Sequence, residues 1–184
     1  MSDALTLVAI VGLPGSGKTV AADFFRSHGF TVLRFGDQTD IGLKELGLPM
    51  NEVNERTYRE NIRKELGMAA MAIKIEPRIT AASKESNRIV LDGMRSFEEY
   101  VYLKGKFPFL TVLCIFAPPH VRYERLAARK VRPLTREESK ARDMSEITAL
   151  NSGGPIAIAD YLIQNEGSSD TFASELERYR ETLS

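Results

Sequence analysis

The sequence predicts an α/β protein in which helices cover both faces of a mostly parallel, five-stranded sheet, as a three-layer α/β/α sandwich. Apolar runs bounded by turn residues recur along the chain, and helix-like segments separate them. The runs are continuously apolar and do not alternate with polar residues, which is typical of strands buried on both faces by crossover helices. A chain of 184 residues is long enough to bury such a core within one domain.

The expected elements follow one another as crossover units along a single domain, residues 1–184. The strands are expected at 5–11, 31–35, 88–92, 109–117 and 160–164, and the helices at 17–28, 51–85, 96–105, 119–130, 135–149 and 169–182. Two stretches exceed what a plain crossover needs. We interpret 38–87 as an insert of acceptor-binding helices and 131–151 as a short lid.

Composition limits the kind of partner. Lysine plus arginine equal aspartate plus glutamate at 25 each, so no global positive field draws the chain to nucleic acid or an anionic membrane. The single cysteine, Cys114, lies in the apolar run FLTVLCIFA and is expected to be a buried core thiol. No secretory leader or apolar run long enough to span a bilayer is visible, which predicts a cytoplasmic protein.

The stretch GLPGSGKT, residues 12–19, fits the pattern G-x-x-x-x-G-K-[ST] between a strand and a helix. Such a loop curls its backbone N–H groups around phosphate oxygens, and the following helix adds partial positive charge. Lys18 is expected to bridge the β- and γ-phosphates, and Thr19 to bind Mg²⁺. We therefore predict a phosphate-loop NTPase fold whose donor site comprises Gly12, Pro14, Gly15, Ser16, Gly17, Lys18 and Thr19.

A second signal narrows the class. RIVLDG places Asp92 at the end of an apolar strand, where a carboxylate can reach Mg²⁺. The next residue is Gly93, whereas many NTP-hydrolysing motors have a glutamate there to orient water. These features favour a small phosphotransferase with ATP and Mg²⁺ as cofactors, or a nucleotide-binding regulator.

Arginines mark the expected lid. VRYERLAARKVR, residues 121–132, spaces Arg122, Arg125, Arg129 and Arg132 along one helical stripe. One interpretation is a lid, continued by Arg142, that closes over the γ-phosphate and excludes water. The alternative is a solvated face paired with acidic neighbours.

The phosphate acceptor should lie across the crevice, at the carboxyl ends of the strands. Asp37 follows the second strand, Arg95 follows the third, and Arg56, Arg59 and Arg63 share one face of the helical insert. A phosphate monoester would need arginines to hold it, whereas a hydroxyl acceptor would make Asp37 a candidate proton acceptor. The sequence carries both kinds of group, so both possibilities stay open.

Several of these motifs resemble the adenylate-kinase-like branch of phosphate-loop kinases. GLPGSGKT is similar to its phosphate loop, DGMRS to the stretch whose arginine holds the acceptor phosphate, and RLAARKVR to the approach to its lid. The C-terminal IADYLIQNEGSSDTFASELE and the Asp37 region look instead like dephospho-CoA kinases. That resemblance places Asn165 and Gly167 near the adenine. The combination most resembles a little-characterised, mainly archaeal group described as adenylate-kinase-related.

These observations predict a Mg-ATP-dependent kinase acting on a nucleoside or deoxynucleoside monophosphate. The expected catalytic residues are Lys18, Asp37, Arg95, Arg129 and Arg142; Arg125, Arg129, Asn165 and Gly167 complete the donor site, and Thr19 and Asp92 hold the metal. The alternatives are a 3'-hydroxyl kinase like dephospho-CoA kinase and an ATP-binding regulator. The expected partner is a small-molecule acceptor, not nucleic acid or membrane, and the expected state is a monomer or homodimer.

Overall fold

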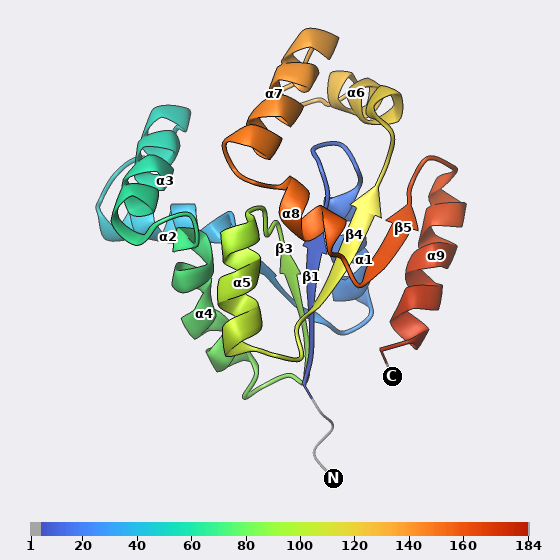
Figure 1. Ribbon diagram of the computed structural model, residues 1–184, viewed down its shortest axis with the longest axis horizontal. Helices are drawn as coiled ribbons and strands as arrows, with labels where there is room; N and C mark the ends of the chain where they lie inside the picture. The colour runs from blue at the N-terminus through green and yellow to red at the C-terminus, as the bar shows by residue number, and fades with distance from the viewer. Residues whose placement is uncertain (1–4, 184) are drawn as a thin grey trace.

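The computed structural model describes residues 5–183, which form one parallel sheet covered by helices on both faces (Figure 1). The strand order is β2-β3-β1-β4-β5, and all four pairings are parallel. The predicted fold class is confirmed. The elements are β1 Thr6–Val11, α1 Lys18–Ser27, β2 Thr31–Arg34, α2 Asp37–Glu45, α3 Glu52–Leu66, α4 Ala70–Ala82, β3 Arg88–Asp92, α5 Phe97–Lys106, β4 Thr111–Phe116, α6 Pro119–Ala127, α7 Arg136–Thr148, α8 Gly153–Ala157, β5 Tyr161–Gln164 and α9 Ser169–Glu181.

The central strand β1 explains the continuous apolar runs. Its side chains alternate between the two faces of the sheet, and each face is covered. Val8 and Ile10 belong to the core beneath α1 and α9, whereas Leu7, Ala9 and Val11 belong to the core beneath α4 and α5. Both periodic positions are therefore buried, as in other doubly covered parallel sheets.

The helical insert differs in detail from the expected continuous stretch at 51–85. α3 and α4 are separate helices, and Gly67 ends α3 with a φ of 77°. A further helix, α2, begins at Asp37. α2 and α3 extend to one side of the sheet in Figure 1, so the chain between β2 and β3 forms a lobe beside the carboxyl ends of the strands.

The second insert also contains an element that the sequence did not suggest. After α7, the short helix α8 packs against α5, and a Cβ on Gly154 would overlap the ring of Phe97. This contact is possible because glycine has no side chain at that position. α7 and α8 thus lie in the connection between α6 and β5, and Figure 1 shows α7 beyond the carboxyl ends of the strands.

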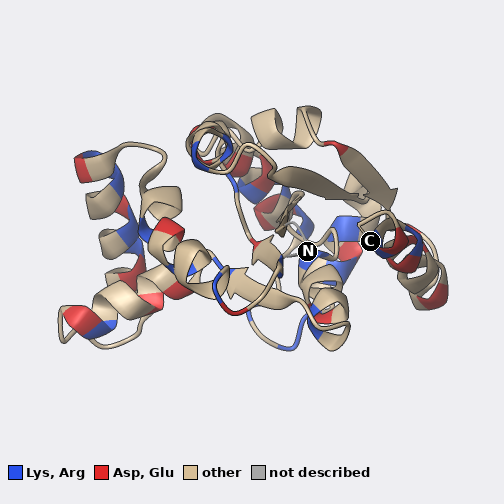
Figure 2. Ribbon diagram, turned by 90° about the horizontal axis from the view of Figure 1, so that it is seen from below, with Lys and Arg blue, Asp and Glu red and all other residues tan. Residues whose placement is uncertain are grey.

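Charge lies mainly on the helices, and the strands are largely uncharged (Figure 2). Cys114 is buried in β4, as expected, and burial raises the pKa of its thiol to about 11. Among residues 5–183, no helix combines the length and apolar character needed to cross a bilayer.

Candidate active site

The phosphate loop connects β1 to α1 and adopts a conformation that its glycines make possible. Gly12, Gly15 and Gly17 have φ values of 142°, 83° and 108°, a region that residues with a side chain rarely adopt. A Cβ on Gly12 would overlap the backbone of Ile115, and one on Gly17 would overlap the side-chain amide of Asn165. The loop therefore leaves room for phosphate oxygens at the N-terminus of α1.

Lys18 lies folded against its own loop. Its Nζ donates to the carbonyl oxygens of Gly12 at 2.7 Å and Leu13 at 3.2 Å. Burial, with the neighbouring Arg95 charge, lowers the pKa of Lys18 to about 8. An anion close to Nζ would offset both effects, so the lysine is well placed to bind phosphate.

Asp92 and Thr19 supply oxygen atoms to the same cavity. Asp92 ends β3, and burial raises the pKa of its carboxyl group. Within residues 5–183, no cluster of three or more His, Cys, Asp or Glu side chains is arranged to hold a metal. A hydroxyl and one carboxylate beside a phosphate loop match how Mg²⁺ is usually bound with nucleotides, since this ion retains water and phosphate ligands.

The loop opens into a cavity of about 680 Å³ at the carboxyl ends of the strands. Its lining includes nine cationic and five acidic side chains, an excess of positive charge in a protein with a formal net charge of zero. The cationic residues are Lys18, Arg34, Arg59, Arg63, Arg95, Arg125, Arg129, Arg132 and Arg142, and the acidic residues are Asp40, Glu55, Asp92, Glu99 and Glu146. Such local charge suits a ligand that carries several phosphates.

On the lid side, Arg125 and Arg129 of the α6 region, Arg132 and Arg142 all line the cavity. Arg125 Nη2 donates to Asn165 Oδ1 at 3.2 Å, whereas its buried Nη1 has no partner within the described part of the chain. A buried N–H group without an acceptor is costly. Arg125 is therefore suited to an oxygen of a bound anion.

Asn165 and Gly167 are not among the residues that line the cavity. Asn165 is 6% exposed and donates from Nδ2 to the carbonyl oxygen of Ser16 at 2.8 Å. It therefore holds the phosphate loop from behind, and through Arg125 it also positions the lid side. Gly167 lies near Thr171 at the start of α9.

The anion-facing role expected for Arg122 is wrong. Its side chain is 3% exposed and forms two bonds to Asp143 of α7, at 2.8 and 2.6 Å. It also donates to the carbonyl oxygens of Ala117 and Pro14. Arg125, three residues further along α6, does face the cavity. A helix turns about 100° per residue, so residues three positions apart point in directions that differ by about 60° and can have different surroundings. Arg122 links the phosphate loop to α7.

On the other side of the cavity, Arg59 and Arg63 of α3 line the wall together with Arg95. Arg56 does not; it is exposed and pairs with Glu60 at 2.8 Å. Arg63 is half-buried and has no carboxylate partner within residues 5–183. The insert thus contributes two of the three expected arginines to the site.

Asp37 is turned away from the cavity. It pairs with Arg78 at 3.2 Å and with Arg34 at 4.0 Å, and it is not among the lining residues. Asp40, one turn later on α2, lines the cavity instead. A carboxylate held by two arginines at the edge of the site is a poor candidate for a proton acceptor.

Several residues that line the cavity were not expected from the sequence, among them Thr39, Glu99 and Glu146. Thr39 is 2% exposed, and its hydroxyl has no partner in the described residues. Glu99 closes a capping box at the start of α5 by accepting from the backbone N–H groups of Arg95 and Ser96. Burial raises its pKa to about 6. Only Glu99 had a visible signal, the S-F-E-E capping pattern.

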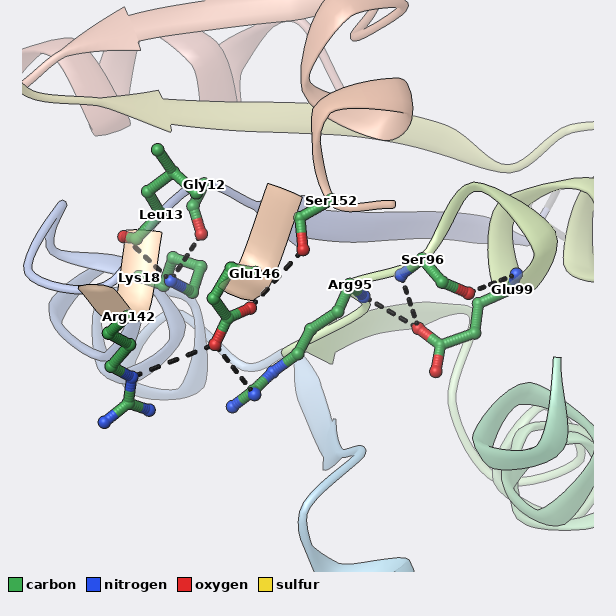
Figure 3. A network of polar contacts seen from close by, with 9 residues as sticks. All are labelled: Gly12, Leu13, Lys18, Arg95, Ser96, Glu99, Arg142, Glu146 and Ser152. Carbon is green, nitrogen blue, oxygen red and sulfur yellow. Dashed lines mark hydrogen bonds and ion pairs between the residues drawn. The ribbon is translucent and has the colours of Figure 1, made fainter. Parts of the chain in front are cut away.

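Glu146 lies between the two sides of the site (Figure 3). Its Oε1 is 3.0 Å from Nη1 of Arg95 and 3.9 Å from Nε of Arg142, and Oε2 accepts from the Ser152 hydroxyl at 3.4 Å. Its side chain is 9% exposed. Arg95 lies between β3 and α5 and Glu146 lies in α7, so their pairing depends on the tertiary structure.

Comparison with known proteins finds a family match and full-length relatives. An AAA domain family, AAA_18, matches residues 8–145. UPF0200 protein TK1334 of Thermococcus kodakarensis is 33% identical, and the match covers 94% of this chain and 95% of that protein. A UPF0200 protein of Methanoculleus marisnigri is 34% identical, and the match covers 94% of this chain and 93% of that protein.

Solved structures share the fold at low identity. TT1252 from Thermus thermophilus has a TM-score of 0.71 at 20% identity, covering 99% of this chain and 100% of that one. Shikimate kinase from Bacteroides thetaiotaomicron has a TM-score of 0.63 at 14% identity, covering 98% and 99%. Dephospho-CoA kinase from Campylobacter jejuni has a TM-score of 0.62 at 18% identity, covering 97% and 96%. The predicted resemblance to phosphate-loop kinases is confirmed at the level of fold.

Proposed function

The chain belongs to the UPF0200 protein family and carries an AAA domain, and from this premise we propose that it is a Mg-ATP-dependent kinase acting on a nucleoside or deoxynucleoside monophosphate. The observation that carries the proposal is the distribution of arginines. One set lies on the lid side of the phosphate loop, and a second set, Arg59, Arg63 and Arg95, lies across the same cavity. Two separate cationic groups suit a donor and an acceptor that both carry phosphate.

The donor side fits ATP and Mg²⁺. The glycine cradle would accept phosphate oxygens and Lys18 would add a positive charge. Nη1 of Arg125, which has no partner within residues 5–183, would offer a further donor. Thr19 and Asp92 would hold the metal, which supplies charge neutralisation to the phosphates when bound. Arg129 and Arg142 would stabilise charge that develops on the transferred group.

The acceptor side would fit a phosphate joined to a group that offers some apolar surface, as a nucleobase does. Phe35, Met71 and Met94 contribute apolar wall. The hydroxyl of Thr39, which has no partner among the residues that the structure describes, would offer one directional contact. Such a mixture is typical of small-molecule sites, where apolar surface gives affinity and few polar groups fix orientation. Arg63, without a carboxylate partner in residues 5–183, is the arginine most available to the acceptor phosphate.

A monophosphate acceptor also agrees with the position of Asp37. The attacking phosphate oxygen is already anionic and needs no proton acceptor, so catalysis would rest on positioning and charge stabilisation. A 3'-hydroxyl acceptor would need a base, and Asp37 is paired with Arg34 and Arg78 outside the cavity. The geometry therefore favours the monophosphate over the hydroxyl kinase.

The test measures ADP release from Mg-ATP with nucleoside and deoxynucleoside monophosphates, dephospho-CoA, or no acceptor. We expect one monophosphate to stimulate release and Lys18→Ala to reduce turnover by about 10² or more. Arg63→Met should raise the acceptor KM by about tenfold, whereas the matched Arg56→Met, on an exposed part of the same helix, should not. If no acceptor raises ADP release and only weak, Lys18-dependent hydrolysis of ATP is seen, a nucleotide-binding regulator would be favoured.

A further inference from the structure

Glu146 places a carboxylate among the cationic side chains of the candidate phosphate-binding site. Its carboxylate contacts Arg95 on the acceptor side and Arg142 on the lid side, and it receives a hydrogen bond from Ser152. Its charge also acts on Lys18, where it opposes the pKa lowering caused by burial and by Arg95. One buried carboxylate therefore neutralises cations from the phosphate loop, the end of β3 and α7.

These same cations are the ones that the proposed reaction requires. Lys18 and Arg142 would contact the transferred phosphoryl group, and Arg95 would contact the acceptor phosphate. Figure 3 shows Arg95 and Arg142 converging on Glu146 from opposite sides. While they do so, neither guanidinium is fully available to a substrate.

We propose that Glu146 is a specificity-determining positioning residue, an internal counter-anion that the phosphate of the acceptor replaces at Arg95. This inference rests on the proposed function. When the acceptor phosphate pairs with Arg95, the Arg95–Glu146 contact is exchanged for a substrate contact. An uncharged acceptor, or water alone, provides no anion for the exchange.

The contacts of Glu146 argue against the competing role of proton acceptor. A general base needs a free lone pair directed at the attacking atom. Both carboxylate oxygens of Glu146 already have partners, and the partners of Oε1 are two guanidinium groups. The geometry is that of a counter-ion.

The exchange has a consequence for substrate selection. Many kinases suppress wasteful hydrolysis by completing the catalytic site only after the correct acceptor binds. Here Glu146 would keep Arg95 engaged until an anionic acceptor arrives. The residue thus makes the release of Arg95 depend on the charge of the acceptor, and it disfavours acceptors that lack a phosphate.

The first arm of the test is binding of inorganic tripolyphosphate, measured by calorimetry without any catalytic step. Glu146→Gln removes one negative charge beside the anion, and we expect affinity to rise at least about tenfold, corresponding to about 1.4 kcal/mol. The tripolyphosphate affinity of Glu146→Asp should lie between those of Glu146→Gln and the wild-type protein. Glu137→Gln makes the same chemical change at an exposed position on α7 and should have no effect.

A background variant tests whether the effect passes through Arg95. In Arg95→Met, the Glu146→Gln change should improve tripolyphosphate binding by clearly less than in the wild type, because one of its two cationic partners is gone. An equal gain in both backgrounds would overturn the exchange at Arg95. Unchanged or weaker tripolyphosphate binding by Glu146→Gln in the otherwise wild-type protein would overturn the counter-anion role itself.

The second arm is kinetic. Glu146→Gln should raise acceptor-independent ADP release several-fold and lower the KM for the monophosphate. Loss of turnover with tripolyphosphate binding unchanged would instead identify a proton acceptor and refute the proposal. If no acceptor stimulates the wild-type protein, the proposed function fails, whereas the binding arm still decides whether Glu146 competes with phosphate.

Discussion

The buried contact between Arg122 and Asp143 gives a prediction that does not depend on the substrate. Asp143→Ala would remove the only carboxylate that Arg122 contacts within the described residues and leave its guanidinium buried. The Arg122 side chain connects α6 to α7 and to the phosphate loop, so the change should destabilise the fold. It should also loosen the loop, since Arg122 Nη1 donates to Pro14 at 3.1 Å.

The magnitude follows from burial and geometry. Arg122 is 3% exposed, Asp143 is 7% exposed, and their two hydrogen bonds measure 2.8 and 2.6 Å. Removing one partner of a buried, well-aligned ion pair costs about 3–5 kcal/mol. In a protein of 184 residues, each kcal/mol lowers the Tm by about 2–4 °C. The expected decrease in Tm is therefore about 6–20 °C.

The assay is thermal and urea unfolding followed by circular dichroism, with Glu137→Ala as the control on the exposed face of α7. A decrease in unfolding free energy below about 1 kcal/mol, or one equal to that of the control, would refute the reasoning. The double variant Arg122→Met and Asp143→Ala should recover part of the loss, because an apolar side chain carries no unpaired charge.

Three further outcomes are expected. The pKa of Lys18 is about 8, below its ordinary value of 10.5, so the side chain loses its positive charge as pH rises through about 8. The affinity for tripolyphosphate, measured by calorimetry, should therefore fall between about pH 7 and 9. The fall should be less steep in Lys18→Arg, because arginine keeps its charge over this range. The Glu99 pKa of about 6 lies above its ordinary 4.5, so the folded protein holds a proton that the unfolded chain releases. Stability should fall by about 2 kcal/mol as pH rises from 4.5 to 7, and Glu99→Gln should flatten this dependence in urea unfolding; a dependence as steep as that of the wild type would contradict the assignment. Thr39→Val should leave the unfolding free energy unchanged or raise it by about 1 kcal/mol, because the buried hydroxyl has no partner in the described residues. The same variant should raise the acceptor KM. If the variant instead lowers both the unfolding free energy and the acceptor affinity, the Thr39 side chain serves packing and not binding.

Much of the fold was visible in the sequence because its signals are local. Apolar runs with no polar alternation identified strands buried on both faces, and the glycine pattern at residues 12–17 specified a phosphate loop before a helix. The break between α3 and α4 and the short α8 were not predicted. Gly67 ends α3 through its own backbone conformation, a local feature that was overlooked. Gly154 allows a close approach to Phe97, and that contact depends on a neighbour distant in the chain.

The site was only partly accessible to such reasoning. Spacing along a helix shows which arginines share a face, but not what that face meets. Arg122 and Arg125 are three residues apart, yet one is buried against Asp143 and the other lines the cavity. Asp37, expected to face the acceptor, is paired with Arg78 across 41 positions of sequence.

The sequence by itself determined the parallel sheet, the phosphate loop with Lys18 and Thr19, and the position of Asp92 at a strand end. Each depends on residues within one or two consecutive elements, where backbone geometry restricts the outcome. Only the tertiary structure decided which charges meet. The pairing of Glu146 with Arg95 joins residues 51 positions apart, because electrostatic contacts depend on distance in space and the fold alone brings α7 over the end of β3.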